Sequence, residues 1–275
     1  FRNTVNPFGI IFNPVSIEKL ILRAINQIKF TEEDIFFHNE RWHCFEVHSD
    51  WSNPSKEALL NNLNDLLQLT KKQLVASTHI IITYGTSWVY CDKHSHTIVA
   101  NCHKVPQSQF DKEILSVSTI EQSIQNTIEI IRQVNTDATI LFTVSPVRHS
   151  KDGFVENQRS KAHLISAIHQ ILNLESQALK YFPSYEIMMD ELRDYRFYAE
   201  DMLHPSAIAI DYIWERFTET WISESVYAVM EEVNSIQKGL LHKPFHPDSE
   251  SHKHFSKKLH DKMERLQQQF PHIQF

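Results

Sequence analysis

Three short apolar segments alternate with segments of helical periodicity, and this alternation constrains the fold more than any other feature of the sequence. The apolar segments are residues 79–84, 138–144 and 179–182, and Gly85, Ser145-Pro146 and Pro183 end them. Apolar runs of this length with such endings indicate buried strands. Strands that alternate with helices at this spacing form a parallel sheet. We therefore predict an α/β fold in which these segments belong to one parallel sheet with helices on both faces.

The segments between these runs carry helix caps and apolar faces. Pro directly after Asn is typical of an N-cap and a first helical residue, and Ser followed three positions later by Glu has capping-box spacing. The helices predicted in this way run from Asn13-Pro14 to about residue 28, from Asn53-Pro54 past Leu74, from Ser118 past Val134, over residues 160–172, and onward from Ser206. From about residue 223 the chain is polar and helical. We predict one domain over residues 1–222 and a helical C-terminal extension over residues 223–275.

Charge, glycine content and cysteine content exclude several functional classes. The net charge is −7, from 27 basic and 34 acidic residues, and this disfavours nucleic acid as a partner because phosphate binding needs a positive field. The four glycines are too few and too scattered for a phosphate-binding loop. No stretch of about 18 apolar residues is present, so no membrane-spanning helix is expected. The three cysteines form no C-x-x-C pair, which favours a reducing, cytoplasmic compartment.

Asp201 and His204 are the clearest candidates for catalysis. A carboxylate three residues before a histidine can reach the imidazole Nδ1–H, fix the tautomer and leave Nε2 as a general base. Pro205 and Ser206 follow and indicate the start of a helix, so the pair lies on a loop. In a parallel sheet, ligands bind at the carboxyl ends of the strands, and the loops after residues 84, 144 and 182 are therefore expected at the same rim. The alternative is an ordinary surface pair at a helix start, because this spacing also arises by chance among 17 histidines.

Several longer segments resemble one protein family. They are residues 5–10 (VNPFGI), 82–90 (ITYGTSWVY), 100–104 (ANCHK), 143–149 (TVSPVRH), 181–186 (YFPSYE) and 190–206, which includes Asp201 and His204. These segments are similar to the GSCFA family, a branch of the SGNH/GDSL esterases, and the similarity extends over about residues 1–245.

The resemblance implies a fold, an activity and roles for residues. It implies a three-layer flavodoxin-like sandwich in which Asp201 and His204 are the acid and the base of a serine triad. The expected activity is ester hydrolysis or acyl transfer through an acyl-serine, on a small acyl ester such as an acetylated carbohydrate. No cofactor and no metal are expected, and the oligomeric state is left open. The competing hypotheses are a non-catalytic binding or scaffold domain and a metal-dependent hydrolase.

The segment after which the family is named is not found in the sequence. In the family a Gly-Ser-Cys-Phe-Ala segment on the first strand carries the nucleophilic serine. We expect that this strand precedes Phe1, that the chain as given is inactive, and that its sheet contains an exposed strand. Ser145 is a poor substitute nucleophile because it lacks a glycine elbow and precedes a proline.

Gly9 and Asn101 are the candidate oxyanion donors. Gly9 matches a superfamily glycine that offers its backbone N–H, although a glycine can also simply permit a turn. The superfamily usually has Gly-x-Asn-Asp where this chain has GTSW at residues 85–88. We therefore take Asn101 as the replacement amide donor, and the alternative is an asparagine that orders its own loop.

Arg148 and His149 are the candidate substrate-binding residues because they follow a predicted strand end. Arginine suits a carboxylate or phosphate on a substrate, and the alternative is a salt bridge to Glu186 or Asp190. The remaining histidines show no H-E-x-x-H motif and are interpreted as scattered surface residues rather than metal ligands.

Overall fold

The computed structural model describes residues 3–174, 178–246 and 249–275, and the chain divides into two compact units. The larger unit is Val5–Ile213 and contains the sheets. The smaller unit contains Trp214–Phe275 and the N-terminal residues up to Thr4. Within the described ranges, no helix combines the length and the apolar character needed to cross a membrane.

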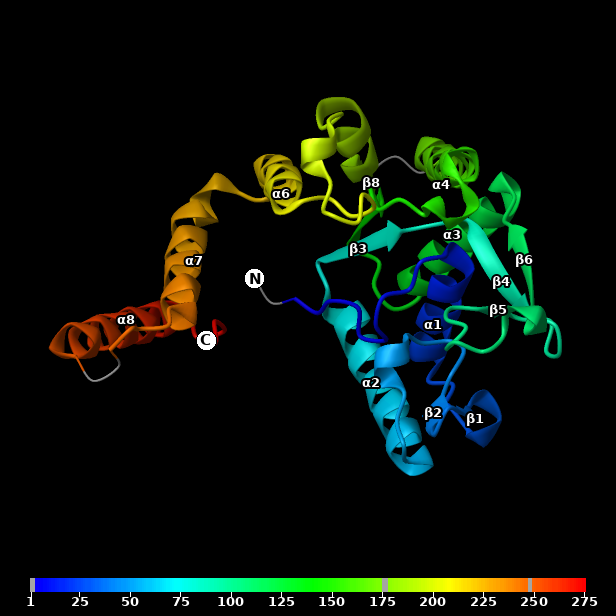
Figure 1. Cartoon of the computed structure of the whole chain (residues 1–275), viewed down its shortest axis with the longest axis horizontal. Helices are drawn as coiled ribbons and strands as arrows, with labels where there is room; N and C mark the ends of the chain where they lie inside the picture. Colours follow the sequence, from blue (N-terminus) through cyan, green and yellow to red (C-terminus); the bar gives the residue numbers. More distant parts are fainter. Residues whose placement is uncertain (1–2, 175–177, 247–248) are drawn as a thin grey trace. The chain divides into compact units, whose positions relative to one another are not determined.

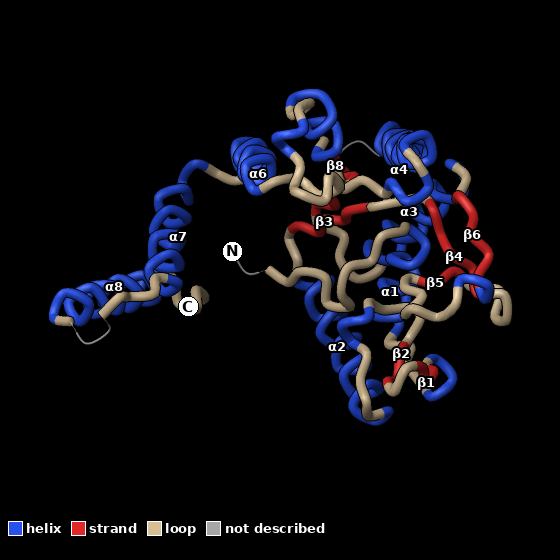
Figure 2. Tube along the Cα trace, viewed as in Figure 1, coloured by secondary structure: helices blue, strands red, loops and turns tan. Residues whose placement is uncertain are grey.

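The larger unit is built on a three-stranded parallel sheet, as predicted. Its strands are β3 (His79–Tyr84), β7 (Thr139–Val144) and β8 (Leu179–Phe182), in the order β3-β7-β8. Figures 1 and 2 label β3 and β8. Ile80, Ile82 and Tyr84 of β3 align with residues 140, 142 and 144 of β7. Each strand lies within one residue of its predicted bounds because the apolar run and its terminator mark both ends.

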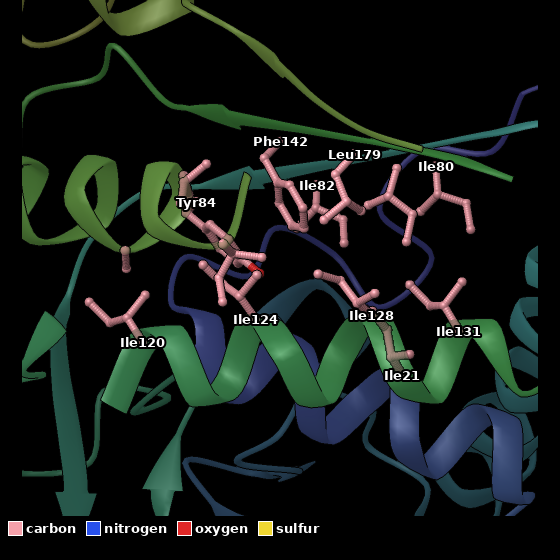
Figure 3. Close-up of a cluster of buried hydrophobic side chains, with 14 of the residues drawn as sticks. Ile21, Ile80, Ile82, Tyr84, Ile120, Ile124, Ile128, Ile131, Phe142 and Leu179 are labelled. Atoms are coloured by element: carbon pink, nitrogen blue, oxygen red, sulfur yellow. The ribbon is translucent and has the colours of Figure 1, made fainter. Parts of the chain in front are cut away.

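Three helices cover one face of this sheet. They are α1 (Pro14–Asn26), α3 (Val117–Arg132) and α4 (Phe154–Leu174). Figure 3 shows the isoleucines of α3 facing the apolar side chains of the strands, with Ile21 of α1 beside them. The cluster that fills this interface includes Ile80, Ile82, Tyr84, Ile120, Ile124, Ile128, Ile131, Phe142, Leu164 and Ile168. Burial of these side chains at helical and strand spacing is the main stabilising contribution to this unit.

The opposite face of the sheet is covered over β7 but not over β3. Leu141 and Thr143 of β7 are buried, and the Thr143 hydroxyl hydrogen-bonds to that of Ser184 at 2.7 Å. Ser184 begins α5 (Ser184–Glu186), which continues as a π-helical turn over Ile187–Glu191. On β3, by contrast, Ile81 is 53% exposed. The prediction that β3 is buried on both faces was wrong for this reason, and among the described strands β3 pairs with β7 alone.

Several helices begin at residues other than the predicted ones. α1 begins as expected, since the Asn13 side chain accepts the Ser16 N–H at 2.9 Å. α2 is Lys56–Ala76 with Ser55 as its cap, because Asn53 instead pairs with Trp42 across a β-bridge. The remaining differences are the cap of α3, which is Ser116 rather than Ser118, and the start of α4, which lies at Phe154.

Two small antiparallel sheets flank this framework, and the sequence analysis predicted neither. The first is a hairpin of β1 (Phe36–His38) and β2 (Arg41–His43). The second has the order β5-β4-β6, from β4 (Trp88–Asp92), β5 (Ile98–Val99) and β6 (Phe110–Ile114). Short 3-10 turns occupy Glu32–Asp34, Ser49–Trp51, Gln107–Gln109, Ser150–Asp152, Tyr195–Phe197 and Glu224–Val226.

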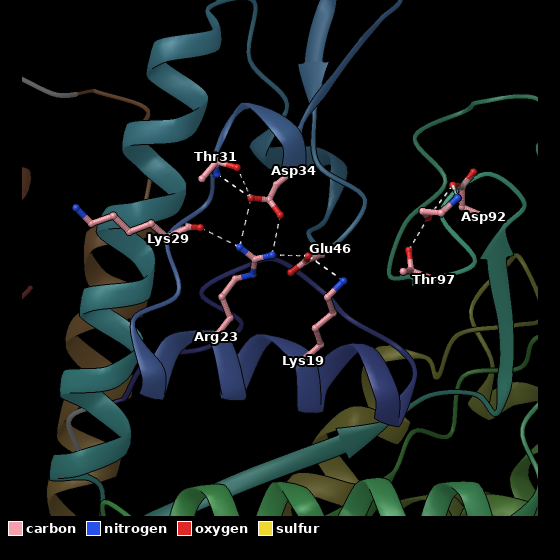
Figure 4. A network of polar contacts seen from close by, with 9 residues as sticks. Lys19, Arg23, Lys29, Thr31, Asp34, Glu46, Asp92 and Thr97 are labelled. Carbon is pink, nitrogen blue, oxygen red and sulfur yellow. Dashed lines mark hydrogen bonds and ion pairs between the residues drawn. The ribbon is translucent and has the colours of Figure 1, made fainter.

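An ion-pair network fastens α1 to the loops beside it. Arg23 is 9% exposed, and its guanidinium contacts Asp34 at 2.7 Å and Glu46 at 2.8 Å (Figure 4). The Glu46 carboxylate also forms an ion pair with the Lys19 ammonium at 3.0 Å, and the Arg23 side chain donates a hydrogen bond to the Lys29 carbonyl. One buried arginine is therefore paired on several sides, which is the condition for keeping a charge in a protein interior.

The smaller unit is helical, as predicted for the C-terminal residues. α6 (Ala207–Trp221) begins in the larger unit and ends in the smaller one, where α7 (Tyr227–Leu241) and α8 (Glu250–Gln269) follow. α7 and α8 pack together, and Gly239 lies so close to Leu259 that an added Cβ would meet its side chain at 2.7 Å. Ser206 caps α6 as expected, with its hydroxyl 3.5 Å from the Ala209 N–H.

Candidate functional site

The carboxyl ends of the three parallel strands meet at one rim. The Ser145 N–H donates to the Tyr84 carbonyl at 2.9 Å, which joins the ends of β7 and β3. The Ser184 hydroxyl donates to the Val144 carbonyl at 2.7 Å, which joins the loop after β8 to β7. The prediction that these loops share a rim is confirmed, and the carboxyl ends of the strands are where open parallel sheets bind their ligands.

Asp201 and His204 form the hydrogen bond that the sequence predicted. The His204 Nδ1 and the Asp201 Oδ2 are 2.6 Å apart, and both side chains are about half exposed. The other carboxylate oxygen, Oδ1, accepts the backbone N–H groups of Leu203 at 2.9 Å and His204 at 3.0 Å. These two backbone hydrogen bonds, with that from the imidazole, lower the pKa of Asp201 to about 2. The carboxylate is therefore ionised at any physiological pH.

The hydrogen bond to an ionised carboxylate fixes the tautomer of His204. Nδ1 carries the proton and donates a hydrogen bond to Asp201, so Nε2 is the nitrogen with the lone pair in the neutral ring. The imidazole is thus oriented through one nitrogen and free to accept a proton through the other. This arrangement can do the chemistry of a general base.

The loop that carries the pair is closed on itself. The Ala199 N–H donates to the His204 carbonyl at 2.8 Å, and Tyr198 pairs with Pro205 across a β-bridge. Met202 has a φ of 61°, and its N–H donates to Ala199 at 2.9 Å. A left-handed methionine costs free energy, so the surrounding hydrogen bonds must hold the tip of the loop in this shape.

Arg148 fastens this loop to the end of β7. Its guanidinium carbon lies 3.8 Å from the centroid of the Tyr198 ring, and its backbone N–H donates to the Leu203 carbonyl at 3.1 Å. The predicted alternative, a salt bridge to Glu186 or Asp190, is not what places the side chain. Glu186 instead accepts the Tyr181 hydroxyl at 2.7 Å. A role of Arg148 in substrate binding stays a prediction, and the structure adds a role in positioning the loop.

His149 lies at the rim next to these groups. Its ring meets that of Phe12 edge-on at 5.9 Å, and its backbone N–H donates to the Asn157 side chain at 2.9 Å. Burial, together with the nearby charge of Lys161, lowers the pKa of His149 to about 4. The imidazole is therefore neutral at pH 7 and can both donate and accept a hydrogen bond, and its role in substrate binding stays a prediction.

Gly9 is required by backbone conformation and by packing. Its φ is +79°, and an added Cβ would lie 2.2 Å from the Cβ of His48. Its N–H donates to the Asn6 carbonyl at 2.8 Å and closes a turn. An oxyanion role for this N–H stays a prediction, and it would require that hydrogen bond to be released.

Asn101 follows β5 and orders its own turn. Its side-chain oxygen accepts the His103 N–H at 2.8 Å, and its backbone N–H donates to the Phe45 carbonyl at 3.3 Å. Within the described part of the chain, neither Asn101 nor Gly9 hydrogen-bonds to the loop of Asp201 and His204. The oxyanion assignment of Asn101 therefore also stays a prediction.

Lys161 and Ser160 of α4 are residues at the rim that the sequence analysis missed. Both are only 1% exposed. The Lys161 ammonium donates to the Gly85 carbonyl at 2.6 Å and to the Ser145 carbonyl at 2.7 Å. Lys161 is in helical register with Leu164 and Ile168 of the buried face, and a lysine on an apolar face was the available signal.

The interpretation of the histidines as scattered surface residues was wrong for His43 and His103, which are buried and pack together near the hairpin. The rings of His43 and His103 are 4.8 Å apart, but His43 is held by Ser52 at 2.7 Å and by the His38 carbonyl at 2.9 Å. The Nε2 of His103 lies 2.7 Å from the Cys44 carbonyl. Among the residues that the structure describes, no group of three or more His, Cys, Asp or Glu side chains is placed to hold a metal ion.

Comparison with known families now decides what these motifs belong to. The model of the GSCFA family matches residues 1–217. The chain belongs to the GSCFA family. The C-terminal domain model of GSCFA domain proteins matches residues 233–275, the region of α7 and α8, so the family accounts for most of both units. No curated protein and no solved structure matches this GSCFA chain.

Proposed function

We propose that this GSCFA protein is a serine esterase or acyltransferase of the SGNH/GDSL superfamily, and that Asp201 and His204 are its acid and base. The observation that carries the proposal is the 2.6 Å hydrogen bond between His204 Nδ1 and an Asp201 carboxylate held by two backbone N–H groups. An ordinary surface ion pair contributes little to stability and does not require a fixed geometry. The fixed geometry of this half-exposed pair therefore supports a functional role.

In the proposed reaction, His204 Nε2 takes the proton of a serine hydroxyl as its oxygen attacks the acyl carbonyl. Asp201 stabilises the resulting imidazolium and keeps the ring in place. The imidazolium then gives its proton to the departing alcohol, which leaves an acyl-serine. Attack by water completes hydrolysis, and attack by an acceptor hydroxyl completes acyl transfer, with His204 again taking the proton of the attacking group.

The open edge of β3 supports a position for the serine. β3 pairs with β7 on one side only among the described strands, and Ile81 is exposed on its uncovered face. An unpaired apolar edge of this kind is normally covered in a folded protein. The proposal places a further parallel strand there, bearing the Gly-Ser-Cys-Phe-Ala segment and supplied from before Phe1. A helix following that strand would complete the flavodoxin-like layering.

The substrate proposed is a small acyl ester, such as an acetylated carbohydrate. The support is a neutral, partly buried His149 at the rim, with Phe12 against its ring. Gly9 and Asn101 are retained as the proposed oxyanion donors, and Arg148 as a residue that also contacts substrate.

A non-catalytic binding domain is the second candidate, and one observation favours it. The Gly9 N–H already donates to the Asn6 carbonyl, so this proposed oxyanion donor is not preformed. At Asn101 only the side-chain nitrogen could donate, because the side-chain oxygen accepts the His103 N–H. Catalysis of acyl transfer needs preorganised donors for the developing charge, whereas binding does not.

The test uses protein expressed from the complete reading frame. A fluorophosphonate probe and p-nitrophenyl acetate report on an activated serine, and mass spectrometry identifies the labelled residue. His204→Ala should lower kcat by at least about 10³-fold, as for members of a serine triad. His94→Ala, at another exposed histidine, is the matched control and should retain wild-type turnover. A His204→Ala protein that labels and turns over like the wild type would exclude the assignment.

A further inference from the structure

We propose that Lys161 is a positioning residue of this site, which ties the carboxyl ends of β3 and β7 together and holds His149 beside His204. The inference rests on the proposed function for its consequence in catalysis, while the tie itself is a property of the fold. Lys161 reaches the rim from α4, which is separated in sequence from both strands.

The ammonium group of Lys161 bridges the ends of two strands. Its two hydrogen bonds go to the carbonyls of Gly85 at 2.6 Å and Ser145 at 2.7 Å. These are the residues directly after β3 and β7, where ladder hydrogen bonding between the strands ends. The third side of the group faces the ring of Tyr185, 5.7 Å from its centroid. The ammonium is therefore satisfied by two backbone carbonyls and an aromatic face, and it bridges the rim at the point where the strands part.

Lys161 is a buried cation, which is an unusual residue for a protein interior. Lys161 is 1% exposed, and no carboxylate is paired with it among its hydrogen bonds. A buried cation is expensive to desolvate, and an apolar residue of the same volume often stabilises a fold at least as well. Burial also lowers the pKa of Lys161 to about 7. A costly charge held at a strand rim, where catalytic groups lie, is therefore better explained by the site than by stability.

The ammonium of Lys161 also affects the pKa of the neighbouring His149. The charged and titratable groups that face His149 are Lys161 of α4, Asp152, His204 and Lys112 of β6. After burial, the charge of Lys161 contributes most to the low pKa of His149. The charge of Lys161 thus adds to burial in keeping His149 neutral, and its hydrogen bond to the Ser145 carbonyl fixes the backbone from which the His149 loop departs. The neutral ring does not repel the imidazolium that forms on His204 during the proposed reaction.

Ser160 supplies a matched control because it is next to Lys161 and its uncharged side chain also hydrogen-bonds to the loop after β3. Its hydroxyl accepts the Ser87 N–H at 2.8 Å and contacts the Thr86 hydroxyl at 3.0 Å. Removing this hydroxyl loosens the loop after β3 without changing any charge. Lys161→Met removes both the charge and the hydrogen bonds at nearly constant volume, and Lys161→Arg keeps the charge.

The experiment measures turnover of the full-length protein and the ¹⁵N-detected titration of the His149 ring by NMR. In Lys161→Met we expect kcat to fall by about tenfold to a hundredfold with a smaller change in KM, as for a misplaced catalytic group. The pKa of His149 should rise in this variant, because a nearby positive charge is gone. Lys161→Arg should recover part of kcat and keep His149 neutral, and Ser160→Ala should leave the His149 titration in place.

Each outcome bears on one of the two proposals. Wild-type kcat in Lys161→Met, or a His149 titration that does not change, would overturn the role of Lys161. A wild-type protein without any esterase turnover would instead remove the proposed function, and the His149 titration would still decide the tie. If Lys161→Met fails to fold, Lys161→Arg becomes the test. A lower kcat with an unshifted KM supports the positioning role of Lys161. Unchanged kinetics with an unchanged pH profile up to pH 9 rejects that role.

Discussion

The guanidinium of Arg148 stacks on the ring of Tyr198, 3.8 Å from its centroid, and this contact joins the end of β7 to the loop that carries Asp201 and His204. The Arg148 backbone N–H adds a hydrogen bond to the Leu203 carbonyl. His204 and Asp201 are therefore positioned by the strand end that also precedes His149.

We expect Arg148→Lys to loosen this loop and to lower kcat about tenfold, because a lysine lacks the planar group that stacks on Tyr198. Steady-state kinetics on the full-length protein measure the effect. Arg159→Lys, at an exposed arginine of α4, is the control and should behave as the wild type. A KM that rises while kcat is unchanged would show that Arg148 binds substrate instead of positioning the loop.

Replacing Asp201 by asparagine should remove most of the activity with little effect on folding. The amide cannot stabilise an imidazolium on His204, and it can hold the ring in the wrong tautomer. We expect kcat to fall by about 10²–10⁴-fold, with an unchanged circular dichroism spectrum. The carboxylate has a pKa of about 2, so the wild-type loop should keep its backbone hydrogen bonds down to about pH 3 and lose them only below that. Activity of Asp201→Asn near the wild-type level would contradict the assignment.

Gly9→Ala should destabilise the protein more than Gly153→Ala. Both glycines have positive φ, +79° and +91°, so both substitutions introduce backbone strain of about 1 kcal/mol or more. Only at Gly9 would the added Cβ collide, 2.2 Å from the Cβ of His48, whereas nothing lies within 4 Å at Gly153. Gly153 has a ψ of 166°, a backbone region open almost only to glycine, so its alanine variant carries full backbone strain without a collision. A lower melting temperature for Gly9→Ala than for Gly153→Ala would therefore point to the collision. Equal melting temperatures would mean that the turn at Gly9 shifts without cost.

Stability should depend on pH differently in wild-type protein and in Lys161→Met. Burial lowers the pKa of Lys161 to about 7 from 10.5, so the unfolded chain binds more protons than the folded one between these values. The cost of burying the charge is therefore fully present below pH 7 and is relieved as the pH rises toward 10. The melting temperature of Lys161→Met relative to wild type should be higher at pH 6 than at pH 9. A constant difference across this range would show that Lys161 does not titrate in the folded protein.

The parts of the fold that the sequence predicted well are those set by local signals. β3, β7 and β8 were found because an apolar run followed by glycine or proline marks both ends of a strand. The bond between Asp201 and His204 was found because its partners are three residues apart. Neither prediction depends on knowing which distant segments touch.

The misses depend on distant contacts. Ser55 rather than Asn53 caps α2 because Asn53 is engaged with Trp42, and this contact cannot be read from the local pattern. β6 was missed because its burial alternates little, with most of its side chains exposed. The role of Lys161 depends on carbonyls 76 and 16 residues away.

The last prediction concerns Ile81 on the uncovered face of β3. The proposed function includes a further strand and helix against β3. In a longer protein that carries them, Ile81 would be buried, whereas in residues 1–275 it is exposed. Ile81→Ser should then cost less than about 1 kcal/mol of unfolding free energy in residues 1–275, where the side chain is 53% exposed. In the longer protein it should cost about 2–4 kcal/mol, as for truncation of a buried aliphatic side chain. Ile82→Ser, whose side chain is 5% exposed in residues 1–275, is the control and should be costly in both. Urea denaturation of the four variants gives the comparison. An equal, small cost of Ile81→Ser in both proteins would leave β3 as a true edge strand, and the proposed position of the serine beside it would be wrong.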